Sequence, residues 1–174
     1  MTQNEEDFKK VLNQTLQFEG GYTVDNGGPT NYGVRQDMYD AYAKQNKVPS
    51  KSVKELKYGE VKDFYKKNYW ETPKINLLPR EIAPSVFDYG VNAGQGKAIM
   101  AVQSIVGAKA DGIIGPKTIK AINKYVEKNG VELLHKQILD NRVEHYNSLV
   151  ASDPQKYGKY FAGWLNRVNK ISQR

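Results

Sequence analysis

Apolar side chains recur three and four positions apart along nearly the whole chain, and this spacing constrains the fold more than any other feature. The first such stretch covers about residues 5–18, where Phe8, Val11 and Leu12 share one face. A period near 3.6 residues places them on one side of an α-helix, whereas a half-buried strand would need strict alternation. The pattern as a whole predicts about seven to nine helices of ordinary length.

Glycine, proline and Asn-Gly steps separate these periodic segments and set the expected helix ends. We expect Gly20-Gly21 to end the first helix in a left-handed cap. The one clear hairpin signal is Asn26-Gly27, whose residues tolerate the tight turn between two strands. The chain therefore predicts a predominantly all-α fold with a small hairpin. The further helices are expected near 33–42, after a capping box at 52–55 and through 61–70, at 82–91, 97–106, 116–129, 131–150 and from 154 onward.

The absence of cysteine among the 174 residues excludes disulfides, thiolate nucleophiles and cysteine-based zinc sites. The two histidines, His135 and His145, are ten positions apart, nearly three helical turns, which is too far to share a metal. We therefore expect no metal and no cofactor. A chain of this length is sufficient for one domain or for two small lobes sharing a core.

The net charge of +7 favours anionic partners such as acidic cell-wall polymers. The lysines are scattered and form no long basic run, so we expect no nucleic-acid partner. No apolar run is long enough for a membrane span, and the acidic N-terminus lacks the features of a secretory signal. We expect a monomer made in the cytoplasm. It would reach the periplasmic or external wall through a holin-type membrane lesion or by dedicated secretion.

Glu19 is the candidate catalytic acid, at the expected end of the first helix. Cleavage of a glycosidic bond needs a carboxylic acid that protonates the leaving oxygen. Burial beside apolar groups keeps such an acid protonated near neutral pH, and Phe18 and Tyr22 flank Glu19 in the sequence. The glycines at 20 and 21 would let a substrate approach the backbone closely. The alternative is an ordinary surface carboxylate at a helix end.

Asp25 and Thr30 follow Glu19 across the expected hairpin and complete a possible acid, base and water-holding trio. If the two carboxylates flank a water molecule, hydrolysis would invert the anomeric configuration. The alternative for Asp25 is an Asx turn, in which the carboxylate bonds to the backbone two residues on.

The block Glu19-Gly20-Gly21-Tyr22, followed by Asp25-Asn26-Gly27-Gly28-Pro29-Thr30-Asn31-Tyr32-Gly33-Val34, resembles the signature of the glycoside hydrolase family 108 N-acetylmuramidases. Many members are phage endolysins or secreted bacterial muramidases. The resemblance implies a lysozyme-like helical fold and cleavage of peptidoglycan glycan strands. It places the family's catalytic Glu, Asp and Thr on Glu19, Asp25 and Thr30. The loop from Tyr22 to Asp25 is shorter here than in the family pattern.

Two further blocks, at 69–70 and 87–94, also resemble the family and supply candidate substrate-binding residues. Aromatic rings suit sugar-binding clefts. Asp88 and Asn92 are one helical turn apart, so they could hold N-acetyl or hydroxyl groups; equally, they could be buried residues bonding to the backbone. The candidates for substrate binding are Tyr22, Tyr32, Tyr69, Trp70, Asp88, Asn92 and Gln103.

The second half of the chain resembles helical peptidoglycan-binding modules. Val102-Gln103 is followed by an Asp-Gly turn at 111–112 and by the block Gly115-Pro116-Lys117-Thr118, and both of these also suit purely structural roles. We therefore expect a muramidase region over 1–94 and a peptidoglycan-binding-like region over 95–174, packed as one compact unit.

Three other functions compete with hydrolysis of the β-1,4 bond between N-acetylmuramic acid and N-acetylglucosamine. A lytic transglycosylase also needs one Glu but uses the muramoyl 6-hydroxyl in place of water. A non-catalytic wall-binding protein would need no acid at all. A nucleic-acid binder lacks a recognition motif here. Phosphoryl and acyl transfer find no support, because the chain has neither a phosphate-binding loop nor a Gly-x-Ser-x-Gly elbow.

Overall fold

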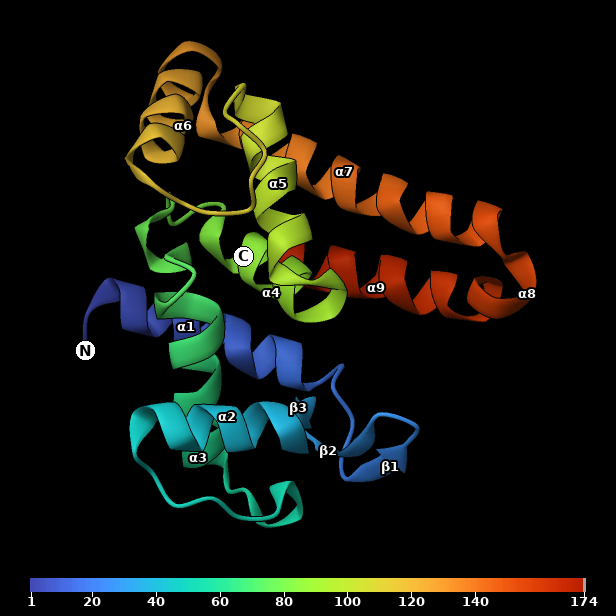
Figure 1. The fold of residues 1–174 in the computed structure, drawn as a ribbon. Coiled ribbons are helices and arrows are strands. Elements are labelled where there is room, and N and C mark those ends of the chain that lie inside the picture. Colours follow the sequence, from blue (N-terminus) through green and yellow to red (C-terminus); the bar gives the residue numbers. More distant parts are fainter. Residues whose placement is uncertain (174) are drawn as a thin grey trace. The chain divides into compact units, whose positions relative to one another are not determined.

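The structure is a computed structural model that describes residues 1–173 (Figure 1). The chain divides into two compact units, Met1–Thr72 and Pro73–Arg174. Helices dominate both units, and the only sheet in the described residues is a small antiparallel one in the first unit. None of the helices between residues 1 and 173 is long and apolar enough to cross a membrane.

The first unit is built around helix α1, whose start is fixed by a capping box. The Thr2 side chain accepts a hydrogen bond from the Glu5 backbone, and the Glu5 carboxylate accepts one from the Thr2 backbone. The apolar face predicted from the sequence is buried as expected. The helical elements of this unit are α1 (Gln3–Leu16), α2 (Gln36–Asn46), the 3-10 turn η1 (Val53–Glu55), α3 (Tyr58–Tyr65) and the π-helical turn η2 (Lys66–Glu71).

A three-stranded sheet connects α1 to α2. Its strands are β1 (Thr23–Asp25), β2 (Gly28–Asn31) and β3 (Val34–Arg35), in the order β1-β2-β3. The turn between β1 and β2 is the expected Asn26-Gly27 step. The second turn is Tyr32-Gly33, with positive φ angles of 51° and 74°. Two left-handed residues in succession define the tight turn that matches the natural twist of a hairpin.

The core of the first unit is aromatic. Trp70 is 1% exposed, packs on Phe8 with ring centroids 5.5 Å apart, and donates from its indole nitrogen to the Asn4 side-chain oxygen at 2.9 Å. Phe64 makes edge-to-face contacts with Tyr42 and Tyr65. Such contacts add to the stabilisation that comes from burial alone, and they fix helix α3 and the turn η2 against their surroundings.

Over the described residues 73–173, the second unit has helices and no strand. Its elements are η3 (Ile75–Leu77), α4 (Ala83–Ala93), α5 (Gln95–Val106), α6 (Pro116–Asn129), α7 (Val131–Ser152), α8 (Pro154–Tyr157), η4 (Gly158–Tyr160) and α9 (Phe161–Ser172). Helix α4 packs against α5, α7 and α9. Pro116 opens α6 and Gly130 ends it, as the sequence predicts.

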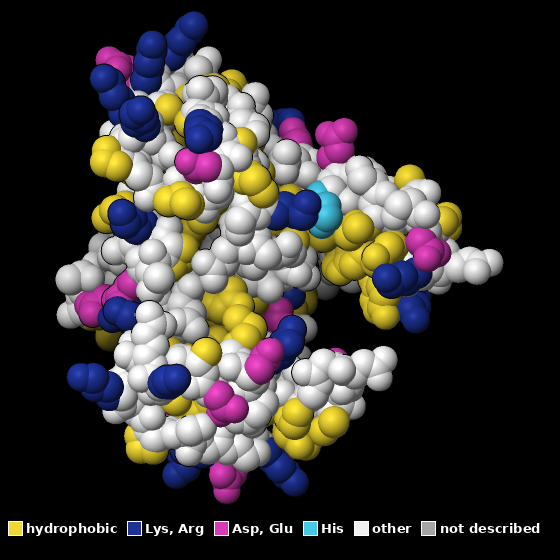
Figure 2. Space-filling model, viewed as in Figure 1, with side chains coloured by type: hydrophobic (Ala, Val, Ile, Leu, Met, Phe, Trp, Pro, Cys, Tyr) yellow, Lys and Arg dark blue, Asp and Glu magenta, His cyan; other side chains and the backbone are white. Residues whose placement is uncertain are grey.

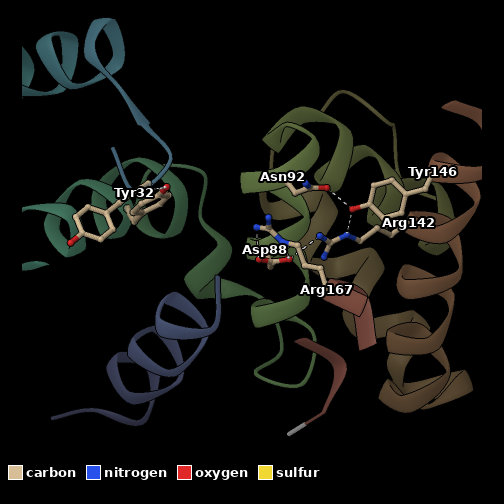
Figure 3. Close-up of polar contacts among 7 residues, drawn as sticks. Tyr32, Asp88, Asn92, Arg142, Tyr146 and Arg167 are labelled. Carbon is tan, nitrogen blue, oxygen red and sulfur yellow. Dashed lines mark hydrogen bonds and ion pairs between the residues drawn. The ribbon is translucent and has the colours of Figure 1, made fainter. Parts of the chain in front are cut away.

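A buried ion-pair cluster joins three helices of this unit (Figure 3). Asp88 on α4 is 0% exposed and receives Arg142 from α7 and Arg167 from α9, each at 2.8 Å. Arg142 also donates to the Tyr146 hydroxyl, which in turn donates to Asn92. Buried charges are tolerated only when they are paired in this way. The cluster therefore fixes the arrangement of α4, α7 and α9.

Three local expectations differ from the structure. Helix α1 ends at Leu16 with Gln17 as a right-handed cap, and neither Gly20 nor Gly21 has a positive φ. The capping residue Ser52 opens only the 3-10 turn η1, while α3 starts later, at Tyr58. The segment after Gly33, expected to be helical, begins with strand β3 because the Tyr32-Gly33 turn pairs it with β2.

Candidate active site

Glu19 lies three residues beyond the end of α1. Its backbone N–H donates to the Thr15 carbonyl at 3.3 Å, which continues the helical path and holds the residue at the helix terminus. The side chain is half-buried. Thr15 itself is completely buried, so the segment that carries the carboxylate is tied to the core of the first unit.

The carboxylate of Glu19 lies against the second hairpin turn. A β-carbon placed on Gly33 would come 2.9 Å from Glu19 Oε2 and 2.7 Å from the Tyr65 hydroxyl. That hydroxyl donates to the Tyr32 carbonyl at 2.7 Å. Glu19, the turn and the α3 tyrosine are therefore packed together, and only glycine leaves room at position 33.

Tyr69 interacts electrostatically with Glu19 and with Arg35. Burial raises the pKa of the Tyr69 phenol, and the negative charge of Glu19 raises it further, while Arg35 opposes the change. Tyr69 therefore keeps its proton at neutral pH. Its ring packs on Tyr65 at 5.4 Å, one helical turn away.

The other candidate polar residues lie on one face of the sheet. Thr30 is paired with Thr23 on one side and with Arg35 on the other, so these three side chains share a face. Asp25 lies two residues from Thr23 and therefore points the same way. The opposite face carries buried Asn31 and Val34. The sequence predicts the trio Glu19, Asp25 and Thr30, and the register places the last two on the face that also carries Arg35.

Asp25 forms the Asx turn that was the alternative for this residue. Its Oδ1 accepts the Gly27 backbone N–H at 2.7 Å. The residue is exposed. The turn and a chemical role are compatible, because one carboxylate oxygen is sufficient to hold the backbone.

The two glycines after Glu19 leave the backbone uncovered. A β-carbon at Gly20 or at Gly21 would meet nothing within 4 Å. Since neither glycine has a positive φ, the backbone there does not require the residue. The space beside this backbone is open to a ligand.

The aromatic candidates divide by exposure. Tyr22 and Tyr32 are 42% and 39% exposed, and Lys54 lies over the Tyr22 ring at 5.3 Å. Tyr69 is half-buried beside Glu19. Trp70 is buried, and its indole N–H bonds to Asn4. We infer a structural role for Trp70, since so little of its ring is left for a sugar to contact.

The polar candidates Asp88, Asn92 and Gln103 belong to the second unit. Asp88 and Asn92 take part in the buried cluster described above. Gln103 is 0% exposed and bonds to the Asp111 side chain, the Thr118 side chain and the Gly112 backbone. These partners occupy the groups that would hold a sugar, so we infer that Asp88 and Gln103 stabilise the fold.

Sequence reasoning missed Tyr65 and Gly33 as neighbours of Glu19. The spacing of Tyr65 and Tyr69, one turn apart, indicated only a helix face. Position 33 requires glycine because it lies against the Glu19 side chain, which is distant in sequence, and no local pattern indicates such a contact.

A mainly α-helical fold with a carboxylate between the first helix and a small sheet defines a lysozyme-like protein. Residues 12–94 match the family model "Glycosyl hydrolase 108", and residues 97–169 match "Predicted Peptidoglycan domain". The first region therefore belongs to glycosyl hydrolase family 108 and the second to the peptidoglycan domain family, which confirms the resemblance found in the sequence.

A solved structure, that of Brucella abortus SagA, has the same fold. It is 26% identical, with a TM-score of 0.76, and the match covers 98% of this chain and 94% of that chain. A search of curated proteins gave no match.

The family matches and the packing divide the chain at different places. Helix α4 lies within the hydrolase match, yet it packs inside the second unit through Asp88. The boundary at residue 94 predicted from the sequence therefore differs from the division between the two compact units, and it stays a prediction. A peptidoglycan-acting glycoside hydrolase is the activity that the two families support.

Proposed function

We propose that the protein is an N-acetylmuramidase of the endolysin type that hydrolyses the β-1,4 bond between N-acetylmuramic acid and N-acetylglucosamine. The observation that carries the proposal is the position of Glu19 within a glycosyl hydrolase 108 region, packed against Gly33 and Tyr65 and beside open backbone at Gly20 and Gly21. A fixed carboxyl group beside open space is what a general acid for glycoside cleavage needs.

In this mechanism Glu19 in its protonated form donates its proton to the leaving oxygen as the bond breaks. Tyr69, which keeps its phenolic proton, contributes a hydrogen-bond donor near the carboxylate formed by this step. Asp25 accepts a proton from the attacking water, and the Thr30 hydroxyl on the same sheet face positions that water. Attack from the face opposite the leaving group gives inversion. Tyr22 and Tyr32 offer exposed rings for sugar contacts.

The test is turbidity loss of purified sacculi with wild type and Glu19→Gln. We expect Glu19→Gln to lose about 10²-fold or more of the activity, the usual contribution of a general acid. Glu55→Gln, which neutralises an exposed carboxylate of the same unit, is the matched control and should lyse normally. Undiminished lysis by Glu19→Gln would remove Glu19 from the mechanism.

The products distinguish hydrolysis from transglycosylation. Hydrolysis leaves reducing N-acetylmuramic acid ends, whereas a lytic transglycosylase leaves 1,6-anhydro ends that are lighter by one water. Mass spectrometry of the released fragments separates the two, and anhydro ends would reject the hydrolytic mechanism.

A further inference from the structure

The net charge of the protein resides entirely in the second unit. Residues 1–72 contain 11 basic and 11 acidic side chains, whereas residues 73–174 contain 15 basic and 8 acidic ones. The unit that carries Glu19 is therefore neutral, and the unit matched to the peptidoglycan domain carries the whole excess of +7. This division localises the attraction to anionic partners.

Four of the 15 basic side chains of this unit lie on one face of α6. Lys117, Lys120, Lys124 and Lys128 recur at spacings of three and four, so their side chains share one side of the helix, here called the lysine face. The opposite side of α6 carries buried Thr118 and Ile122. Figure 2 shows Lys and Arg side chains gathered over this helix.

All four lysines line a groove of about 510 Å³ between α6 and the end of α5. Its other lining residues are apolar or uncharged, so no carboxylate contributes to it. In the described residues 1–173, none of the four lysines is ion-paired with a carboxylate. Like charges at this spacing repel one another, and a bound anion would relieve the repulsion.

A second, apolar groove of about 430 Å³ lies on the other side of Lys120. Its apolar lining comes from Leu77, Ile114, Pro116 and Ile119, and Lys120 lines both grooves. Leu77 is 56% exposed, so the apolar surface faces solvent. A ligand that fits both grooves would combine small apolar groups with negative charges a short distance apart.

We infer that the lysine face of α6 binds the stem peptides of peptidoglycan through their free carboxylates, with the alanine methyl groups entering the apolar groove. The inference rests on the proposed function and adds the part of the polymer that the second unit contacts. The sugar rings of the glycan are uncharged, so the carboxylates that lysines can bind lie on the stems. Lysines act as point charges toward such groups, and neither groove contains an arginine.

The experiment measures co-sedimentation of the Glu19→Gln protein with sacculi, which separates binding from cleavage. Replacing all four lysines with Gln should weaken binding about tenfold or more at low salt, since charges of this kind dominate the encounter. A matched control replaces Lys9, Lys10, Lys44 and Lys47, which are exposed lysines of the first unit, and should bind normally. A variant with four Arg residues on α6 keeps the charge, should retain binding, and shows that the positions tolerate substitution.

Binding to two chemically treated wall preparations identifies the part of the wall that the lysines contact. Glycan strands stripped of their stems by an amidase, with the lactyl carboxylates that this cleavage exposes then capped as amides, should lose the lysine-dependent binding. Sacculi treated with hydrofluoric acid lack phosphodiester polymers but keep their stems, and they should retain it. Full binding to stripped strands, loss of binding to acid-treated sacculi, or normal binding by the four-Gln variant would each overturn the inference. Since turnover is not measured, these results stand whether or not Glu19 proves catalytic.

Discussion

The α-carbon of Gly33 faces the carboxylate of Glu19 so closely that a methyl group there would lie 2.9 Å from Oε2 and 3.1 Å from Cγ. Position 33 also needs a positive φ of 74°, which residues other than glycine rarely adopt. The turn therefore links two strands and also limits the positions that the Glu19 side chain can adopt.

Gly33→Ala should reduce lysis strongly, because the new methyl group must displace either Glu19 or Tyr65. Gly130→Ala is the control, since it has a φ of 86° but open space around the added carbon. Gly33→Ala should also lose about 1–2 kcal/mol of unfolding free energy from its left-handed backbone, and Gly130→Ala should lose at least as much, because its ψ of 150° lies in a region that essentially only glycine adopts. Turbidity assays measure the loss of lysis and thermal melts measure the loss of stability. Equal activity of the two variants would contradict this steric role of the turn.

Gly20→Ala and Gly21→Ala should fold normally yet cleave more slowly. An added methyl group meets no protein atom at either position, so any loss of activity comes from contact with the substrate. Gly59→Ala is the control. It lies in the first turn of helix α3, also in open space, and should change stability by less than about 1 kcal/mol with unchanged activity. A normal KM and kcat in both variants at 20 and 21 would show that the substrate does not approach this backbone.

Asp25→Asn and Asp25→Ala separate the turn from the chemistry. Asn retains an oxygen that can accept the Gly27 N–H, whereas Ala does not. If Asp25 activates water, Asn should lower kcat by about 10²-fold or more with little change in melting temperature. If only the turn matters, Asn should be nearly fully active and only Ala should be impaired. Kinetics on soluble glycan fragments, paired with melts, decide between the two.

Asp88→Asn should destabilise the protein by about 3–5 kcal/mol, because it leaves Arg142 and Arg167 buried without their counter-charge. Asp140→Asn removes an exposed ion pair with Lys136 and should cost well under 1 kcal/mol. Urea unfolding measures both. A small effect at Asp88, coupled with a raised KM, would instead support the substrate-binding role expected from the sequence.

Stability should fall as the pH drops below about 6.5, in part through His145. Burial lowers the pKa of this ring below 6.5, and Lys97 and Arg142 lower it further. The unfolded chain then binds more protons than the folded one, so the contribution is complete above the unfolded pKa and is lost as pH falls through the folded one. His145→Gln should flatten this part of the profile. An unchanged slope in thermal melts between pH 7 and pH 5 would contradict the assignment.

Much of the fold could be predicted from spacing alone. Segments such as 97–106 and 131–150 repeat the helical period clearly, and the structure confirms helices there with boundaries shifted by a few residues. The Asn26-Gly27 turn was predictable because its residues are those that the turn geometry requires. The Tyr32-Gly33 turn was not, since a tyrosine rarely adopts a left-handed conformation; here the Tyr65 hydroxyl holds its carbonyl.

The candidate site was predictable to the extent that it lies in one short segment. Glu19, Asp25 and Thr30 are close in sequence, so a motif could indicate them. The Glu19 contacts with Gly33 and Tyr65 depend on how α3 packs, which no local pattern encodes. The helical spacing of Asp88 and Asn92 predicts that they share a helix face, but it cannot show that arginines more than 50 residues away pair with the buried carboxylate.

The uneven distribution of charge also bears on how the protein would move across its substrate. If the basic second unit binds the wall as proposed, each rebinding keeps Glu19 of the same chain at a high effective concentration near its substrate. Very low salt would slow release from the wall and very high salt would abolish binding to it. Lysis should therefore pass through a maximum as ionic strength increases, with residence time on the wall, more than the bond-breaking step, setting the rate on either side.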